Sequence, residues 1–120
     1  MLRTYLHAKI HRATVTEANL GYEGSVTIDQ SLMEAADIQP NEAVHVWDVT
    51  NGARIETYAI PGKPGSGVIC INGGAAHLIK AGDLVVIANF VSLSAEEVKT
   101  HHPRKIFVDS QNAITQTVSA

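Results

Sequence analysis

The segment VHVWDVTNGARIETYAI, residues 44–60, decides the fold class of this chain. In its two runs, 44–49 and 54–60, side chains of different polarity alternate, as they do on the two faces of a strand. Both runs are rich in β-branched and aromatic residues. Between the runs, Asn51 and Gly52 form the dipeptide that favours a two-residue type I′ turn. The segment therefore predicts a β-hairpin.

Similar strand-like runs lie on both sides of this hairpin. Residues 2–16 alternate over enough length for one long strand or two bent ones, and 25–28 and 105–108 form short runs. Two nearly continuous apolar runs, 67–72 and 83–90, are typical of buried strands. Many short strands in a chain of 120 residues predict one mainly β domain, a β-barrel with a few short helices.

The expected helices are few. Ser31 is followed three residues later by Glu34, a capping box that predicts a helix over 31–38. Ser94, with a glutamate at the same spacing, predicts a second helix over 94–100. Both segments are short, so the helices are expected to be inserts in the β structure.

The remaining segments are expected to be turns and loops. Two glycines precede small helix formers in 73–79, which predicts a short helical turn. Prolines and glycines crowd 61–67, which indicates a loop, and the polar, weakly patterned residues 109–120 indicate a loose tail.

Composition excludes several classes of protein. A hydrophobic fraction of 45%, a charged fraction of 18% and a net charge of −3 describe a globular chain without the basic footprint of a nucleic-acid binder. The single cysteine, Cys70, predicts a reducing compartment and a small buried side chain. The longest apolar stretch, 84–91, is far below the ~20 residues that span a bilayer. A cytoplasmic protein without a membrane partner is expected.

Most familiar catalytic motifs are missing. The chain has no HExxH, no paired CxxC, no GxSxG and no P-loop. His7 and His11 are four residues apart, a spacing that on a strand separates side chains by about 13 Å. A shared metal ion is therefore not expected.

The tripeptide Glu23-Gly24-Ser25 admits two interpretations. A Gly-Ser pair is usually part of a loop. Alternatively, the serine hydroxyl attacks the preceding carbonyl, turning the amide into an ester, and elimination then leaves a dehydroalanine that hydrolyses to a pyruvoyl group. A glycine before the serine suits this reaction because it leaves the carbonyl open to attack. The spacing alone leaves both interpretations open.

Two further groups of residues suit the binding of an anion. On a strand, Arg54 and Tyr58 share one face, and they offer a planar donor for carboxylates and a phenolic proton donor. The glycines in 71–77 are able to form a backbone nest, and Lys9 and His11 share one face of the first strand. Each group also has an ordinary structural interpretation, such as a cross-strand ion pair, a tight connection or an exposed strand face.

Four segments in this order resemble the aspartate 1-decarboxylase family, whose members make β-alanine for pantothenate synthesis. They are LHAKIHRATVTEANLGYEGSVTID (6–29), NEAVHVWDVTNGARIETYAI (41–60), INGGAAH (71–77) and GDLVVIANF (82–90). The resemblance runs from about residue 1 to about residue 108 without large gaps. One departure is Gly74, where the family commonly has alanine.

The resemblance implies a double-psi β-barrel and a homotetramer that acts on L-aspartate. It implies self-cleavage into a β chain, 1–24, and an α chain, 25–120, headed by a pyruvoyl group from Ser25 that forms a Schiff base with the substrate. Neither pyridoxal phosphate nor a metal is implied. By the same resemblance, Thr57 assists cleavage and contacts substrate, and Tyr58 is the proton donor. The other implied site residues are Gly24 at the cleavage site, Gly73, Gly74, Ala75, Arg54 and Lys9 as substrate-binding residues, and His11, Tyr22 and Asn72 as supporting residues.

Three alternatives stay open at this stage. In the first alternative, the chain is a non-enzymatic β-barrel that binds a ligand or nucleic acid through the basic residues Arg3, Lys9 and Arg12. The acidic net charge and an aromatic fraction of 5% count against this alternative. A second alternative is a pyruvoyl enzyme for another amino acid. A third is a chain whose self-cleavage requires a helper protein.

Overall fold

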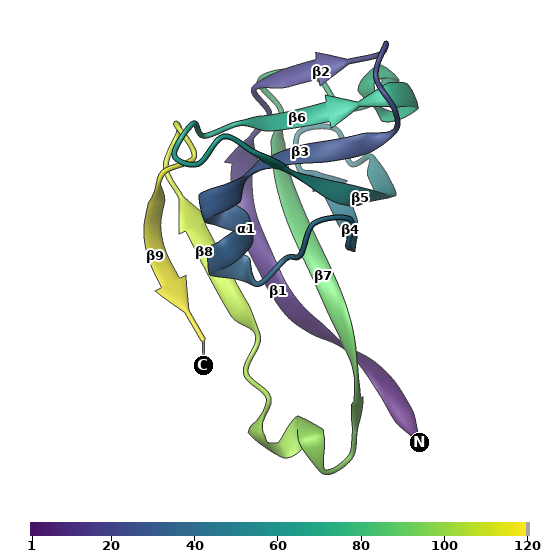
Figure 1. Ribbon diagram of the computed structural model, residues 1–120, viewed down its shortest axis with the longest axis vertical. Coiled ribbons are helices and arrows are strands. Elements are labelled where there is room, and N and C mark those ends of the chain that lie inside the picture. The colour runs from purple at the N-terminus through teal and green to yellow at the C-terminus, as the bar shows by residue number, and fades with distance from the viewer. Residues whose placement is uncertain (120) are drawn as a thin grey trace.

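A sheet of mixed direction organises the chain (Figure 1). In the computed structural model, which describes residues 1–119, nine strands are hydrogen-bonded in the order β2-β6-β3-β5-β4-β7-β1-β8-β9. The strands are β1 (Leu2–Thr14), β2 (Glu17–Asn19), β3 (Ser25–Asp29), β4 (Ala43–Asp48), β5 (Arg54–Gly62), β6 (Ile69–Asn72), β7 (Leu84–Ser94), β8 (Arg104–Val108) and β9 (Ile114–Val118). The helical elements are α1 (Gln30–Ala36) and the 3₁₀ helices η1 (Gly73–His77) and η2 (Glu97–Thr100).

Strands far apart in the chain lie side by side. β3 pairs with β5 in parallel and with β6 antiparallel, and β1 pairs with β7 antiparallel and with β8 in parallel. Such crossed pairings agree with the double-psi β-barrel that the resemblance implies. The predicted fold class, a mainly β domain with a few short helices, is confirmed.

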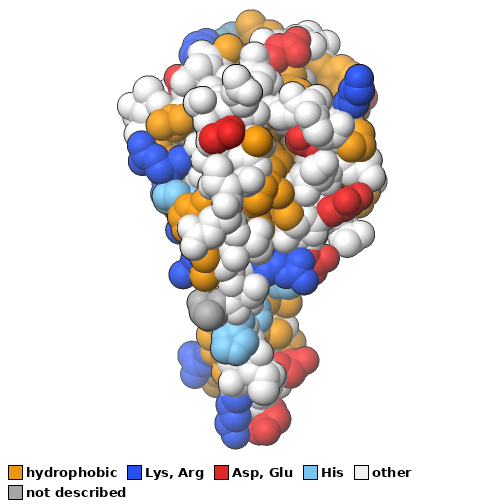
Figure 2. Space-filling model, turned by 90° about the vertical axis from the view of Figure 1, so that its left-hand side faces the viewer, with side chains coloured by type: hydrophobic (Ala, Val, Ile, Leu, Met, Phe, Trp, Pro, Cys, Tyr) orange, Lys and Arg blue, Asp and Glu red, His pale blue; other side chains and the backbone are white. Residues whose placement is uncertain are grey.

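The molecule tapers along β1 and β7. In Figure 1 these two long strands run together to the lower end, where the N-terminus and the segment that joins β7 to β8 lie, while β2, β6, β3 and η1 gather at the upper end. Figure 2 shows the same taper from the side, with charged and histidine side chains on the narrow end. Within residues 1–119 no helix has the length and apolar character needed to cross a membrane.

The hairpin predicted for 44–60 is confirmed, but its predicted turn is wrong. Strands β4 and β5 pair antiparallel, and residues 49–53 connect them. A type I′ turn needs positive φ at both central residues, and Gly52 has it (φ 83°) whereas Asn51 does not. The Asp48 carboxylate accepts the backbone N–H groups two and three residues on, at 2.7 and 3.1 Å, and so stabilises a wider loop.

The first predicted capping box is wrong, and the second is confirmed although its helix is shorter than predicted. α1 begins one residue before Ser31, and its N-cap is Asp29, whose Oδ1 accepts the Ser31 N–H at 2.8 Å. A carboxylate two residues upstream therefore replaces the predicted hydroxyl cap. Ser94 and Glu97 do exchange the reciprocal bonds of a capping box, at 2.9 and 3.1 Å. The helix that follows is only the short η2, which buries no residue.

The prediction of a loose tail over 109–120 is wrong for residues 114–118. They form β9, which pairs antiparallel with β8. All but the last residue of β9 are exposed, so the sequence has no alternating apolar pattern that would predict the strand. The buried Asn112 connects this region to the barrel, because its side chain bonds the backbone of Thr14 and Gly67. Ala120 lies outside the described residues.

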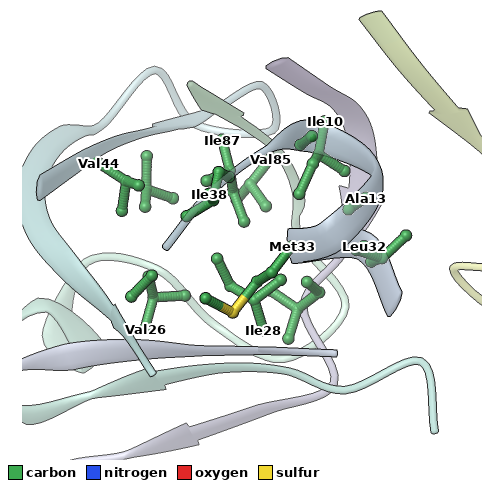
Figure 3. Packing of buried hydrophobic residues seen from close by; sticks show 14 of the residues in the cluster. Ile10, Ala13, Val26, Ile28, Leu32, Met33, Ile38, Val44, Val85 and Ile87 are labelled. Carbon is green, nitrogen blue, oxygen red and sulfur yellow. The ribbon is translucent and has the colours of Figure 1, made fainter. Parts of the chain in front are cut away.

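The core lies between α1 and the strands. Figure 3 shows Ile10, Val26, Ile28, Met33 and Ile87 pointing toward one another, and each is almost fully buried. They come from β1, β3, α1 and β7, so the helix closes one side of the barrel. This packing fixes β3, the strand that begins at Ser25.

Asp29 joins the helix to the 63–67 loop. Its carboxylate accepts the backbone N–H groups of Ser31, Gly65 and Gly67 at 2.8, 3.0 and 2.8 Å. Burial raises the pKa of Asp29, but the hydrogen bonds from Gly67, Ser31 and Gly65 outweigh it, and the net pKa is lowered. The ionised carboxylate therefore stabilises the folded state.

Asp29→Ala is expected to lower the free energy of unfolding by about 2 kcal/mol at neutral pH, because the helix cap and the loop bonds are lost together. Because the folded pKa is lowered, this contribution is fully present above the unfolded value of about 3.9 and is lost as the pH falls through the folded value. Thermal unfolding of the parent chain and the variant between pH 7 and pH 3 measures the difference in their stability. Glu96→Gln, at an exposed carboxylate, is the control. A stability difference between parent and Asp29→Ala that stays constant with pH would contradict the stabilising role of the ionised Asp29 carboxylate.

Candidate functional site

The position of β3 between β5 and β6 brings the predicted site residues together. In the antiparallel pair, Ser25 lies opposite Asn72. In the parallel pair, Val26 lies opposite Ala59, so continuing the register by one residue aligns Ser25 with Tyr58. A further step aligns the glycine before Ser25 with the threonine before Tyr58. Three segments remote in sequence therefore meet at the start of β3.

Ser25 is buried and bonded on both sides. The residue is only 2% exposed. Ser25 Oγ donates to the carbonyl oxygen of Glu23 at 3.0 Å and accepts from Nδ2 of Asn72 at 3.0 Å. A surface Gly-Ser turn would leave this hydroxyl in water, so the buried setting favours the chemical interpretation of the tripeptide.

Asn72 is the centre of a small polar network. Its Nδ2 also donates to Oγ1 of Thr27 at 3.0 Å, and its Oδ1 accepts from Sγ of Cys70 at 3.2 Å. Alternation along β3 and β6 places Ser25, Thr27, Cys70 and Asn72 on one face, because Ser25 is opposite Asn72 and Thr27 is opposite Cys70. The amide of Asn72 thus has a partner for each of its polar atoms.

Thr27 and the polar role of Cys70 were not predicted from the sequence. The apolar run around Cys70 predicted only burial, which is correct, since the residue is 6% exposed. The available signal was the two-residue spacing of Cys70 from Asn72, which places both side chains on one face of a strand.

Gly73 brings η1 directly against the Gly24–Ser25 segment. Its backbone has φ 79°, a region that favours glycine. A Cβ on Gly73 would lie 2.7 Å from Cα of Gly24 and 3.2 Å from the carbonyl oxygen of Tyr22. A Cβ on Gly74 would instead point into open space, with no neighbouring segment within 4 Å. Gly74 therefore has room for the alanine that the resembled family commonly carries.

Arg54 is the first residue of β5, four residues before Tyr58. Its guanidinium carbon is 4.4 Å from the ring centre of Trp47, a cation–π contact. A cavity of about 300 Å³ is lined by His45, Trp47, Arg54, Ile55 and Glu56. Four residues along a strand correspond to about 13 Å, so Arg54 and Tyr58 share a face without touching.

Lys9 and His11 lie on a strand that is not hydrogen-bonded to β3. They lie on β1, which β5, β4 and β7 separate from β3. The His11 ring packs edge-on against Phe107 with centroids 5.5 Å apart. Burial, followed by the charges of Lys9 and Arg12, lowers the pKa of His11, which favours the neutral ring at neutral pH. Among the described residues 1–119, no hydrogen bond, ion pair or ring contact joins Lys9 or His11 to Ser25.

The predicted absence of a metal stays a prediction. In the part of the chain from 1 to 119, no three His, Cys, Asp or Glu side chains form a group that could hold a metal ion.

Comparison with known proteins places this arrangement in one family. The family model described as aspartate decarboxylase matches residues 1–115. The chain belongs to the aspartate decarboxylase family. Its relatives include aspartate 1-decarboxylase of Listeria monocytogenes serotype 4a, 56% identical over 114 residues that cover 95% of this chain and 90% of the relative. Aspartate 1-decarboxylase of Syntrophotalea carbinolica is 55% identical over 115 residues, which cover 96% and 88% of the two chains.

Membership of the aspartate decarboxylase family confirms the resemblance seen in the sequence. It also confirms the prediction of an enzyme, and the alternative of a non-enzymatic binding module is wrong. Within one chain, the structure of this family member brings together Gly24, Ser25, Asn72 and Gly73 by contact. Tyr58 directly precedes Ala59, the parallel partner of Val26. The roles of these residues are proposals, taken up below.

Gly73→Ala is expected to lower the free energy of unfolding by about 1–3 kcal/mol, because the new methyl group meets Gly24 and the positive φ becomes strained. Gly74→Ala is the matched control and should unfold at the same temperature as the parent chain. Thermal unfolding of the three proteins makes the comparison. Equal stability of the two alanine variants would show that the backbone of η1 does not pack against residue 24.

Proposed function

We propose that this protein decarboxylates L-aspartate to β-alanine and CO₂, for pantothenate and coenzyme A synthesis. The observation that carries the proposal is the buried Ser25, preceded by an exposed glycine and bonded to Asn72. Family membership supports the substrate, since the relatives named above are aspartate 1-decarboxylases. The lone buried cysteine supports the proposed cytoplasmic location.

The first step in the proposal is cleavage between Gly24 and Ser25. Ser25 Oγ attacks the carbonyl carbon of Gly24, and the hydroxyl proton passes to the Ser25 nitrogen as the C–N bond breaks, which gives an ester. Loss of the Ser25 Cα proton then expels the Gly24 carboxylate, which takes the electrons of the C–O bond. Water adds to the resulting dehydroalanine and releases ammonia. The products are a β chain, 1–24, and an α chain, 25–120, that begins with a pyruvoyl group.

The residues around Ser25 fit such a group. A pyruvoyl group has oxygen acceptors and no hydroxyl donor, so it needs donors around it. Asn72 presents N–H donors on the side of Ser25, and the site is buried from water. When formed, the group supplies the electron-withdrawing ketone that decarboxylation of an amino acid requires.

Side chains on β5 have separate proposed tasks. Thr57, aligned with Gly24 by register, stabilises the oxyanion during cleavage and contacts substrate. Tyr58, aligned with Ser25, returns a proton to the α-carbon after CO₂ has left. Arg54 binds the side-chain carboxylate of aspartate, since an ion pair on the departing carboxylate would stabilise the ground state more than the transition state.

The remaining residues complete the proposed site between subunits of a homotetramer. Lys9 and His11 are remote from Ser25 in the sheet order of one chain, so we place them with the Ser25 of a neighbouring subunit. The backbone of Gly73, Gly74 and Ala75 contacts substrate, and Tyr22, whose side chain is exposed in one chain, lines the entrance.

Ser25→Ala is expected to remain a single chain and to form no β-alanine, because the attacking oxygen is gone. Ser66→Ala is the matched control, since Gly65-Ser66 is a second Gly-Ser pair on an exposed loop. Denaturing electrophoresis measures cleavage, and product analysis with aspartate and glutamate measures activity and substrate choice. β-Alanine formation at the parental rate by Ser25→Ala would refute the proposal.

Tyr58→Phe separates cleavage from turnover. The variant should be cleaved normally, because Tyr58 takes no part in attack on Gly24. Its kcat should fall by about 100-fold or more, because the proton donor is lost. An unchanged kcat in a fully cleaved Tyr58→Phe enzyme would remove Tyr58 from this role.

A further inference from the structure

The side-chain amide of Asn72 has two possible orientations, in which its nitrogen and its oxygen exchange places. Its two partners on β3, the hydroxyls of Ser25 and Thr27, both lie 3.0 Å from Nδ2. A hydroxyl donates or accepts with equal ease, so it bonds either end of an amide. Ser25 Oγ donates its one proton to the carbonyl oxygen of Glu23 and so favours the amide nitrogen, whereas Thr27 has no such constraint. The amide oxygen of Asn72 still needs a donor of its own.

Cys70 supplies this donor and so strengthens the same orientation. Its sulfur lies 3.2 Å from Oδ1 of Asn72. A thiol offers one S–H donor, while its sulfur is only a weak acceptor, so it favours the amide oxygen over the amide nitrogen. With the oxygen held by Cys70, the nitrogen is left for Ser25 and Thr27.

The thiol is in its protonated form. The Cys70 residue is buried, and β2 places Glu17 opposite it in the sheet. Burial first, and then the nearby Glu17 carboxylate, raise the pKa of the Cys70 thiol. The hydrogen-bond geometry assigns the single S–H donor to Oδ1 of Asn72. The donor is thus maintained at neutral pH.

The orientation matters for the cleavage step. Once Ser25 Oγ has attacked and become an ester oxygen, it has no proton and only accepts hydrogen bonds. An N–H of Asn72 suits Oγ both before and after attack. A flipped amide would instead place its oxygen against the ester oxygen, where two acceptors repel each other.

We infer that Cys70 is a positioning residue for backbone cleavage, which it promotes by fixing the Asn72 amide with its nitrogen toward Ser25. The inference rests on the proposed self-cleavage of the chain. It assigns Cys70 no contact with the reacting atoms. Its effect passes entirely through Asn72.

The test follows the rate at which freshly synthesised, uncleaved chain is cut, by denaturing electrophoresis. Cys70→Ala should slow cleavage by about fivefold, the effect of losing one modest hydrogen bond. Cys70→Ser retains a donor and should cleave within about twofold of the parent chain. A Cys70→Ala chain that is cleaved at the parental rate would overturn the inference.

A double-mutant cycle separates positioning from packing. In an Asn72→Ala chain, Cys70→Ala should have no further effect on the rate, because the amide that it orients is gone. The same slowing in both backgrounds would show that Cys70 acts by packing alone and would overturn the inference.

Two further comparisons keep the test informative if a variant misfolds or the parent chain is not cleaved. If Cys70→Ala fails to fold, Cys70→Thr and Cys70→Val form an isosteric pair that differs in a hydroxyl donor, and the threonine variant should be cut faster. Equal rates for that pair would overturn the inference. If the parent chain itself is never cleaved, both the proposed function and this inference are wrong. If parent and variants are cleaved at equal rates, only the inference is wrong.

Discussion

The hydrogen bond from Asn72 to Ser25 depends on a strand pairing that no local segment determines. The two residues are 47 positions apart in the chain and meet only because β3 pairs antiparallel with β6. The same strand pairs on its other edge with β5, which carries Thr57 and Tyr58. The core residues Val26 and Ile28 anchor the opposite face of β3, so the burial of Ser25 follows from the packing of the barrel.

Much of the fold was predictable because alternation of side chains is a strong signal. It placed the long first strand, the hairpin of β4 and β5 and the apolar strands β6 and β7. It failed for β9, whose residues are mostly exposed and which is joined to the barrel through the buried Asn112. It also failed at the helix cap, because the choice of Asp29 depends on its contacts with a remote glycine loop.

The site was less predictable from physical pattern alone. A Gly-Ser pair is common in loops, and only the resemblance to a family singled out Ser25. The structure distinguishes the two Gly-Ser pairs of the chain. Ser25 is buried and bonded to Asn72, whereas Ser66, in the 63–67 loop, is exposed. Lys9 and His11 could not be placed by such reasoning, because β5, β4 and β7 separate their strand from β3 in the sheet. Arg54 lies on β5 itself, four residues before Tyr58.

The central claim is that the chain makes its own ketone at residue 25. Intact-mass measurement of the mature protein under denaturing conditions, before and after treatment with a hydrazine that labels carbonyl groups, tests it most directly. The account predicts two fragments that meet between Gly24 and Ser25, with one label on the longer fragment and none on the shorter. An active protein that runs as one unlabelled chain, or whose longer fragment begins with an unmodified serine, would contradict it.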